Sequence, residues 1–84
     1  MNKCRINIAL FEPSELVCEG MANLLLKEGS HFFLFHVNDI EELYELISKE
    51  KIHIVLINPS MIQNRIIEFN RLKNLCGNIS WIGL

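Results

Sequence analysis

The stretch KIHIVLINPSM, residues 51–61, decides how the rest of the chain is interpreted. Its run HIVLI, residues 53–57, is apolar nearly throughout, as expected of a central parallel strand that is covered on both faces. The run ends at Asn58-Pro59-Ser60. Parallel α/β sheets collect functional groups beyond the carboxyl ends of their strands. Here the group is an amide, which binds metals weakly and is a poor nucleophile.

Strand patterns and helix patterns alternate on both sides of this stretch. RINIAL, residues 5–10, alternates aliphatic residues with small or polar ones and predicts a strand. HFFLFHV at 31–37 predicts a second strand, and ISWIGL at 79–84 predicts a fourth. Helix-length segments separate the strands. The order βαβαβαβ therefore predicts one α/β domain with a parallel sheet and right-handed crossovers.

The first predicted helix begins at Pro13, with Ser14 or the preceding turn as its cap, and ends at Gly29. Apolar or small residues recur in it at spacings of three and four, which predicts one buried face. That predicted face consists of Leu16, Val17, Gly20, Met21, Leu24 and Leu25. We expect Gly20 to let the helix lie close to the sheet.

The second predicted helix follows Asp39, and Glu42 stands three residues later in the pattern of a capping box. Its predicted apolar stripe consists of Ile40, Leu43, Tyr44 and Ile47. The third predicted helix ends near Gly77 and is marked by Ile62, Ile66, Phe69 and Leu72. The chain shows no internal repeat, linker or low-complexity segment.

Length and composition predict one small and unusually apolar domain. The chain has 84 residues, of which 50% are hydrophobic, and its mean hydropathy is +0.23. A domain of this size buries only roughly 60% of the surface of its unfolded chain. So much apolar content predicts that some of it faces a partner or a missing part of the same domain.

Charge and hydropathy exclude several classes of function. The net charge is −2 and basic residues never cluster beyond two neighbours, which argues against nucleic-acid binding by this segment. The longest apolar runs are far shorter than the ~20 residues of a membrane span. No signal-peptide pattern is present. We therefore expect a cytoplasmic protein with no membrane attachment.

Cysteine and histidine residues form no recognisable metal motif. The three cysteines lack CxxC or zinc-type spacing, so we expect reduced thiols; they are Cys4, Cys18 and Cys76. The histidines are His31, His36 and His53, and structural or surface roles are expected for them. His53 is expected near the start of its strand, at the edge of the sheet opposite the site.

Two loops are expected at the functional edge of the sheet: FEPSE at 11–15 and NPSM at 58–61. Asn58 suits a turn in which the side chain bonds to its own backbone. This is compatible with a vestigial active site, which only the resemblance described below implies.

The other polar side chains of these loops also have ordinary roles. Glu12 is a candidate metal ligand, although a solvated loop carboxylate is the favoured interpretation. Ser14 and Ser60 are expected to be helix caps, since neither has a general-base partner in the sequence.

Several stretches resemble a known family when they are taken in order. LFEPSELVCEGMANLLLKEG, residues 10–29, resembles the first strand, loop and helix of response-regulator receiver domains of the LuxR/NarL type. IHIVLINPSM at 52–61 resembles their third strand and phosphoacceptor turn, and ISWIGL at 79–84 their fourth strand. The resemblance implies a flavodoxin-like (CheY-like) three-layer fold with strand order 2-1-3-4. It covers residues 1–84 as a partial receiver, because the family's last helix–strand–helix has no counterpart.

Receiver chemistry requires residues that this chain lacks. In the family, two acidic residues and an aspartate hold Mg²⁺, and the aspartate attacks a phosphoryl donor. By this resemblance Glu12 stands at the first acidic position, Pro13 at the second and Asn58 at the phosphoacceptor, with Ser14 and Ser60 on the pocket rim. The family's switch Thr/Ser and its Lys have no counterpart. The resemblance thus implies a non-catalytic pseudo-receiver with no cofactor, no phosphorylation at Asn58 and weak or absent Mg²⁺ binding. An uncharged turn is expected to hold the domain in one conformation.

The leading hypothesis is a regulatory domain of a transcriptional regulator that works through protein–protein contact. DNA would be contacted only by a domain beyond residue 84. By analogy the fourth strand is a sheet edge that carries Trp81, Ile82 and Leu84, and we expect a homodimer or higher oligomer through this strand or the exposed faces of the sheet. Two alternatives stay open. One is a small-molecule sensor that uses the pocket at the carboxyl ends of strands one and three. The other is an enzyme fragment, for which no nucleophile–base set is found.

Overall fold

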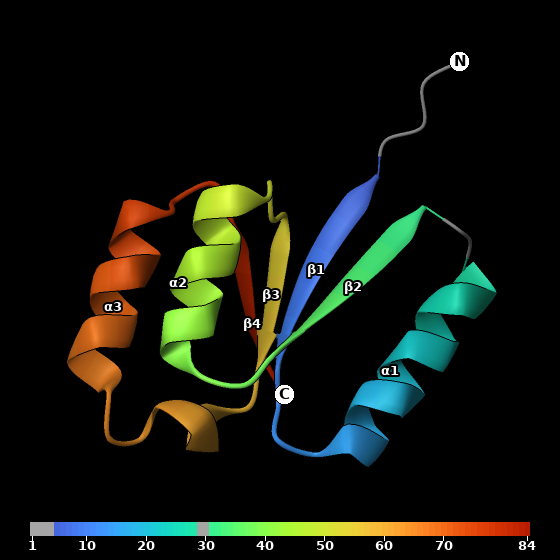
Figure 1. The fold of residues 1–84 in the computed structure, drawn as a ribbon, viewed down its shortest axis with the longest axis horizontal. Helices are drawn as coiled ribbons and strands as arrows, with labels where there is room; N and C mark the ends of the chain where they lie inside the picture. Colours follow the sequence, from blue (N-terminus) through green and yellow to red (C-terminus); the bar gives the residue numbers. More distant parts are fainter. Residues whose placement is uncertain (1–4, 29–30) are drawn as a thin grey trace.

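A computed structural model describes residues 5–28 and 31–84 of the chain. It contains one sheet with helices on both faces (Figure 1). The strands are β1 (Ile6–Phe11), β2 (Phe32–Val37), β3 (Ile54–Ile57) and β4 (Ser80–Gly83). The helices are α1 (Glu15–Glu28), α2 (Ile40–Lys49) and α3 (Ile66–Leu75), and a 3₁₀ turn (Pro59–Ile62) follows β3.

The sheet is parallel and its strand order is β2-β1-β3-β4. This confirms the predicted α/β class and the order 2-1-3-4, which is that of the first four strands of the flavodoxin-like fold. Phe11, the last residue of β1, pairs with Ile57, the last residue of β3. The loops that follow these two strands therefore leave the same edge of the sheet side by side.

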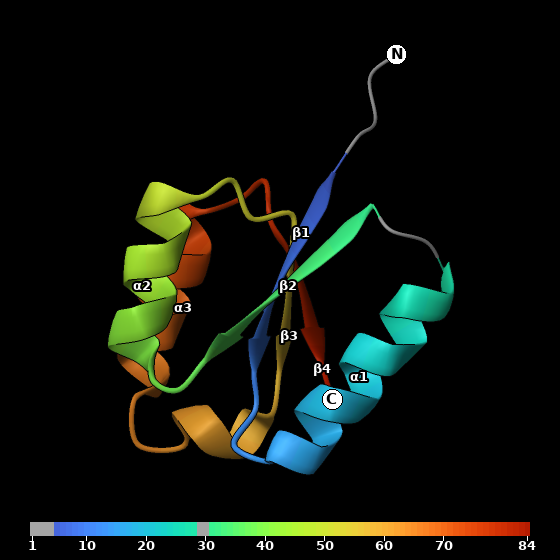
Figure 2. The ribbon, with the colours of Figure 1, turned by 45° about the vertical axis from the view of Figure 1, so that its right-hand side comes forward.

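The main core lies between the sheet and the pair α2 and α3, which cover one face together (Figure 2). Alternate strand residues such as Ala9, Phe11 and Val55 point into it. Leu43 of α2 is completely buried, as predicted, whereas Tyr44 is 59% exposed. The stripe of α2 is thus narrower than the sequence pattern predicted, because Tyr44 lies beside the groove between the two helices.

The segment after β3 also differs from prediction. Ile62 is buried, but it belongs to the 3₁₀ turn and not to the third helix. Phe69 and Leu72 of α3 are buried as predicted, while Ile66 is more than half exposed. The helix begins only at Ile66 because the polar segment after the 3₁₀ turn separates the two elements.

The predicted apolar face of α1 is only partly correct, because Met21 and Leu25 face the sheet but its other members do not. The side of α1 toward the sheet consists of half-buried Cys18, Met21, Ala22 and Leu25. Leu16, Val17, Gly20 and Leu24 are exposed, and no residue of the helix is fully buried. A Cβ added at Gly20 would meet nothing within 4 Å, so this glycine does not serve close packing on the sheet. The pattern misled because α1 is apolar on two sides.

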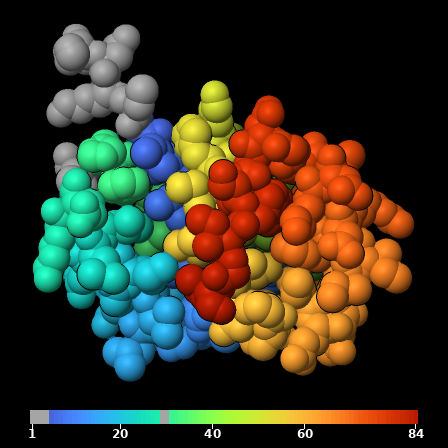
Figure 3. Space-filling model, turned by 180° about the vertical axis from the view of Figure 1, so that it is seen from behind, coloured from blue at the N-terminus to red at the C-terminus, as the bar shows by residue number. Residues whose placement is uncertain are grey.

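The face of the sheet that α1 covers is only partly shielded. On this face Ile8 and Leu10 of β1 are buried, but Ile54 and Leu56 of β3 are only half-buried. The prediction that β3 is covered on both faces is therefore confirmed for one face and only partly for the other. Seen from behind, the atoms of β4 are not covered by other segments (Figure 3).

The edge strand β4 directs its side chains to opposite faces. Ile82 is 46% exposed, and Leu84, which follows the strand, is 49% exposed. Trp81 instead packs edge-on against Phe69 of α3, with ring centroids 5.4 Å apart. Its indole Nε1 is buried without a hydrogen-bond partner among the described residues. Of the three apolar residues predicted at this edge, Ile82 and Leu84 are therefore exposed to solvent, and Trp81 packs against the core.

Two helix starts match the sequence patterns. The Asp39 carboxylate accepts the Glu42 N–H at 2.8 Å, and Glu42 in turn accepts the Asn38 N–H at 2.9 Å. This is a variant of the capping box, because the Glu42 side chain accepts the N–H of Asn38 and not that of the N-cap residue Asp39. The Ser14 hydroxyl accepts the Val17 N–H at 3.2 Å, which confirms Ser14 as the cap of α1.

Among the described residues, we find no helix with the length and apolarity needed to cross a membrane.

Candidate functional site

The candidate site lies at the carboxyl edge of the sheet, where β1 and β3 end. The Asn58 N–H donates to the Phe11 carbonyl at 2.9 Å, which continues the β1–β3 ladder by one bond. The Asn58 side chain then donates from Nδ2 to Glu12 Oε1, also at 2.9 Å. Two residues 46 positions apart in sequence are thus joined by backbone register and by a side-chain bond.

Glu12 is buried, with only 4% of its surface exposed. Its second oxygen, Oε2, accepts the Ser14 N–H at 2.9 Å. The favoured sequence interpretation, a solvated loop carboxylate, is therefore wrong. A buried carboxylate without hydrogen bonds is costly. The burial of Glu12 is tolerated because both of its oxygens accept hydrogen bonds.

Asn58 also organises its own turn. Its Oδ1 accepts the Ser60 N–H at 3.0 Å, which confirms the turn role and makes Asn58 the cap of the 3₁₀ turn. Pro59 follows at the first position, where the absence of an N–H removes no bond. Ser60 is not the cap, contrary to the prediction, because Asn58 already occupies that position.

The residues at this edge do not fit a Mg²⁺ site. Mg²⁺ requires several oxygen ligands in near-octahedral geometry. Both Glu12 oxygens and Asn58 Oδ1 already accept N–H groups, and Asn58 turns its amide nitrogen toward Glu12. Pro13 is exposed and has no ligand atom in its side chain. Within residues 5–28 and 31–84, no group of three or more His, Cys, Asp or Glu residues is placed to hold a metal.

The structure brings two further residues to this edge, of which His36 escaped the sequence analysis. His36 Nε2 lies 2.9 Å from the Glu12 carbonyl oxygen, and Cys18 Sγ lies 3.8 Å from the same oxygen. His36 comes from the end of β2, so the strand order could have placed it beside β1. Cys18 lies on α1, beside the same loop. Burial, and then the neighbouring carboxylates Glu12 and Glu15, raise the pKa of the Cys18 thiol, which disfavours the nucleophilic thiolate.

His53 lies at the opposite edge, as predicted. Its Nδ1 accepts the Asn7 N–H at 3.0 Å, and Asn7 is itself buried. Asn7 Nδ2 donates to the Lys51 carbonyl at 2.7 Å. These bonds tie the start of β3 to β1 and give His53 a structural role.

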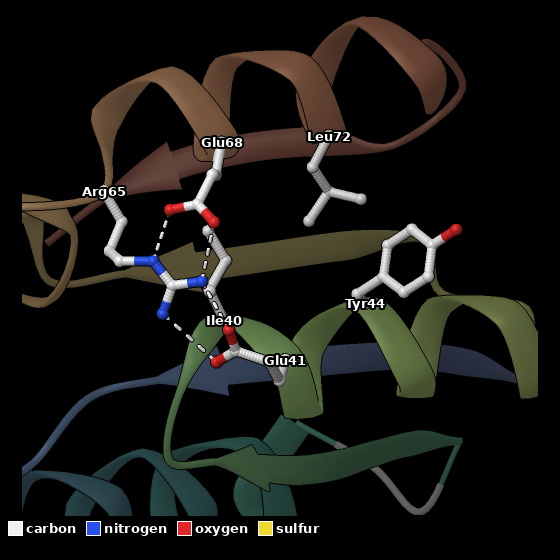
Figure 4. A pocket seen from close by; sticks show the side chains of 6 residues that line it. All are labelled: Ile40, Glu41, Tyr44, Arg65, Glu68 and Leu72. Atoms are coloured by element: carbon white, nitrogen blue, oxygen red, sulfur yellow. Dashed lines mark hydrogen bonds and ion pairs between the residues drawn. The ribbon is translucent and has the colours of Figure 1, made fainter.

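A separate cavity of about 220 Å³ lies between α2 and α3 (Figure 4). Arg65 donates to Glu41 of α2 and Glu68 of α3, and these bonds lower the pKa of both carboxyls. Ile40 and Leu72 form its apolar walls. The three charged groups bind one another, so they act as a solvent-exposed link between the helices. Sequence patterns did not indicate this link because Arg65 and Glu41 belong to different elements.

No protein-family model, curated protein or solved structure matches this chain significantly. The resemblance to receiver domains therefore rests on the sequence stretches quoted above.

Proposed function

We propose that this chain is a non-catalytic, receiver-like regulatory domain of a two-component-type transcriptional regulator. It acts in the cytoplasm through protein–protein contact and without phosphorylation. The observation that supports this most is the hydrogen bond from Asn58 Nδ2 to Glu12 Oε1. It joins, within one site, the two positions that the resemblance assigns to the phosphoacceptor and to a metal ligand.

The amide at position 58 takes over a task that otherwise needs a cation. Two carboxylates at this distance would repel each other, and a bound cation or a shared proton would be needed to hold them together. Asn58 instead donates to Glu12 and accepts from Ser60 without any ligand. The end of β1 and the turn after β3 are thereby held in one arrangement, which suits a domain that is recognised by its shape.

The other residues of the site also favour a role without catalysis. Ser14 uses its hydroxyl oxygen to accept the Val17 N–H. Asn58 has no carboxylate with which to form an acyl phosphate. The Glu12 side chain is buried and both of its oxygens already accept hydrogen bonds, so it is not placed to take a proton from a neighbouring hydroxyl.

The proposal is tested by intact-mass spectrometry after incubation with acetyl phosphate and Mg²⁺. We expect the mass to equal that of the same protein incubated without acetyl phosphate, because no side chain at the site is an activated nucleophile. A stoichiometric phosphoryl adduct that fragmentation locates at Ser14, Ser60 or another residue of this edge would overturn the proposal.

Self-association is the protein–protein contact that we propose, with β4 at or near the interface. The Ser80 N–H donates to the carbonyl of His53, just before β3, and the Leu84 N–H donates to Ile57 of β3. The backbone N–H and C=O groups of Trp81 and Gly83 therefore point to the free edge of the sheet. Ile82 and Leu84 add exposed apolar surface there. DNA would be contacted by a separate domain.

A small-molecule sensor is a second hypothesis for the same edge. The cavity between α2 and α3 does not support it, because that cavity contains neither Glu12 nor Asn58. The hydrogen-bonding atoms of these two residues are also largely occupied by each other and by backbone N–H groups.

A further inference from the structure

Strand β2 is an outer strand of the sheet, and its outer side is open. In the order β2-β1-β3-β4 it pairs with β1 alone, and no strand among the described residues pairs with its other side. Figure 2 shows the sheet nearly edge-on, with β2 in front of the other strands and with α2 and α1 on either side. A further strand could therefore approach this edge from solvent.

The register with β1 determines which backbone groups of β2 are free. The His31 carbonyl accepts the Ile6 N–H at 2.9 Å, so the backbone groups of His31 and of every second residue after it point to β1. The N–H and C=O groups of the residues between them point outward, and these residues are Phe32, Leu34 and His36. Within the part of the chain that the structure describes, these outward groups form no backbone hydrogen bond.

This edge lacks the features by which edge strands usually avoid pairing. Such strands are often very short, or carry charged residues, proline or a bulge. Strand β2 has six residues, FFLFHV, without a charged residue, proline or glycine. Its pairing with β1 is continuous from Phe32 to Val37. The strand is therefore suited to bind an extended segment by β-augmentation.

Two aromatic rings line this edge on the face that α2 covers. Phe33 and Phe35 contact each other with ring centroids 4.8 Å apart, and Phe35 also packs against the main core. Phe33 is 45% exposed, and the Arg5 guanidinium lies over its ring at 4.3 Å from the centroid. Side chains of directly opposed strand residues lie within about 5 Å of each other, so an added strand would contact both rings.

A cavity of about 250 Å³ lies beside the same edge, between β2 and α2. Phe35 and Leu46 contribute apolar surface to it. Of the charged residues that line it, Lys49 pairs with Glu45 at 3.9 Å, whereas Glu42 has no cationic partner among the described residues. The cavity therefore suits a side chain with an apolar stem and a positive charge.

The position of α1 favours an extended segment over a second copy of the chain. Helix α1 contacts β2 more than any other strand, and it lies on one face of the sheet beside this edge (Figure 2). Two β2 strands paired with each other would lie about 4.8 Å apart, whereas a helix is about 10 Å wide. The α1 helices of two copies would therefore collide. An extended segment carries no helix and avoids this conflict.

We propose that the outer edge of β2 binds an extended segment of a partner protein in the antiparallel direction, which is slightly more stable per residue than the parallel one. The segment carries an apolar residue opposite Phe35. A basic residue precedes it and lies near Glu42, and an acidic residue follows it and lies near Arg5. This contact goes beyond the proposed function and does not depend on it.

A titration of the full chain with a synthetic peptide, followed by NMR, tests the proposal. The probe is Thr-Lys-Thr-Leu-Thr-Glu-Thr, blocked at both ends, in which the charges have the order that antiparallel pairing requires. We expect a Kd below about 1 mM. The matched control peptide has lysine and glutamate exchanged, and it should bind at least threefold more weakly. High salt should reduce this difference, because it screens exposed charges.

Amide hydrogen exchange locates the bound peptide. In the free protein, the N–H groups of Phe33 and Phe35 point to β1 and should exchange slowly, whereas those of Leu34 and His36 should exchange fast. When most of the protein is bound, exchange at Leu34 and His36 should slow at least threefold. Unchanged exchange at these two amides in the bound protein would contradict pairing at this edge.

A proline substitution separates the edge from the fold. Leu34→Pro removes an N–H that points outward and leaves the bonds to β1 in place, which is the position that edge strands tolerate. It should weaken peptide binding at least tenfold. Leu34→Ala is the matched control, because it removes the same side chain and keeps the N–H, and it should weaken binding less than threefold. Circular dichroism should show the same helix content in both variants.

Several results would overturn the proposal. Absence of binding by the wild type at millimolar peptide would do so, and so would tighter binding of the exchanged peptide or equal binding by the two Leu34 variants. Self-association of the wild type that Leu34→Pro abolishes would mean that a second copy occupies the edge, which also contradicts the proposal. None of these results depends on phosphorylation, so the acetyl phosphate experiment is decided separately.

Discussion

Replacement of Asn58 by aspartate should lower the free energy of unfolding by about 2–4 kcal/mol at neutral pH, a large effect for one nearly isosteric change. The variant loses the hydrogen bond from Nδ2 to Glu12 and places a second carboxylate against one that is 4% exposed. Urea denaturation measures the loss. Asn38→Asp is the matched control, since Asn38 lies beside the Glu42 carboxylate on the exposed surface, and it should change stability by less than about 0.5 kcal/mol.

The Asn58→Asp loss should depend on pH in one direction. A neighbouring carboxylate raises the pKa of one member of the pair in the folded state above its unfolded value. The penalty is therefore complete above that raised pKa and diminishes as the pH falls through it, because the introduced carboxyl group, once protonated, can again donate to Glu12. Mg²⁺ should recover part of the loss in this variant and none in the wild type. Equal stability of variant and wild type at neutral pH would show that the bond between Asn58 and Glu12 contributes little.

Leu43→Ala should destabilise the domain by about 2–5 kcal/mol, whereas Tyr44→Ala should cost less than about 1 kcal/mol. The two residues are neighbours on α2 and were predicted to share its apolar stripe. In the fold Leu43 is 0% exposed, so truncation leaves a cavity in the core between the sheet and α2 and α3. Tyr44 is 59% exposed at the groove between α2 and α3.

Thermal and urea denaturation of both α2 variants would measure this difference. Circular dichroism under native conditions should show the wild-type helix content for each variant that is folded. A variant that is unfolded should lose all of its spectroscopic signals together. Similar costs for the two truncations would mean that the burial of α2 follows the sequence pattern and not the arrangement described above.

The candidate site was only partly predictable. The sequence placed Glu12 and Asn58 in two loops at the carboxyl ends of strands, and the parallel order brought those loops to one edge. It did not predict that Glu12 is buried, because burial depends on the loops and helices that surround it. It also missed His36, whose contact with the Glu12 carbonyl requires β2 to lie next to β1.

Helix α1 shows a different limit of sequence patterns. Its length and its cap at Ser14 follow from local preferences and were predicted. Its sheet-facing side was predicted only in part, because the helix has apolar residues on two sides and periodicity alone cannot choose between them. The choice of Met21 and Leu25 over Leu16 and Leu24 is made by where the sheet lies.

The sequence by itself therefore determined the order of strands and helices, the parallel sheet, and the residue types at the end of each strand. These depend on the spacing of apolar residues and on caps within a few residues of chain. The tertiary structure alone decided the burial of Glu12, the side of α1 that faces the sheet and the link from Arg65 to Glu41. Each of these joins segments that are distant in sequence, and such contacts depend on strand order and register, which no local pattern contains.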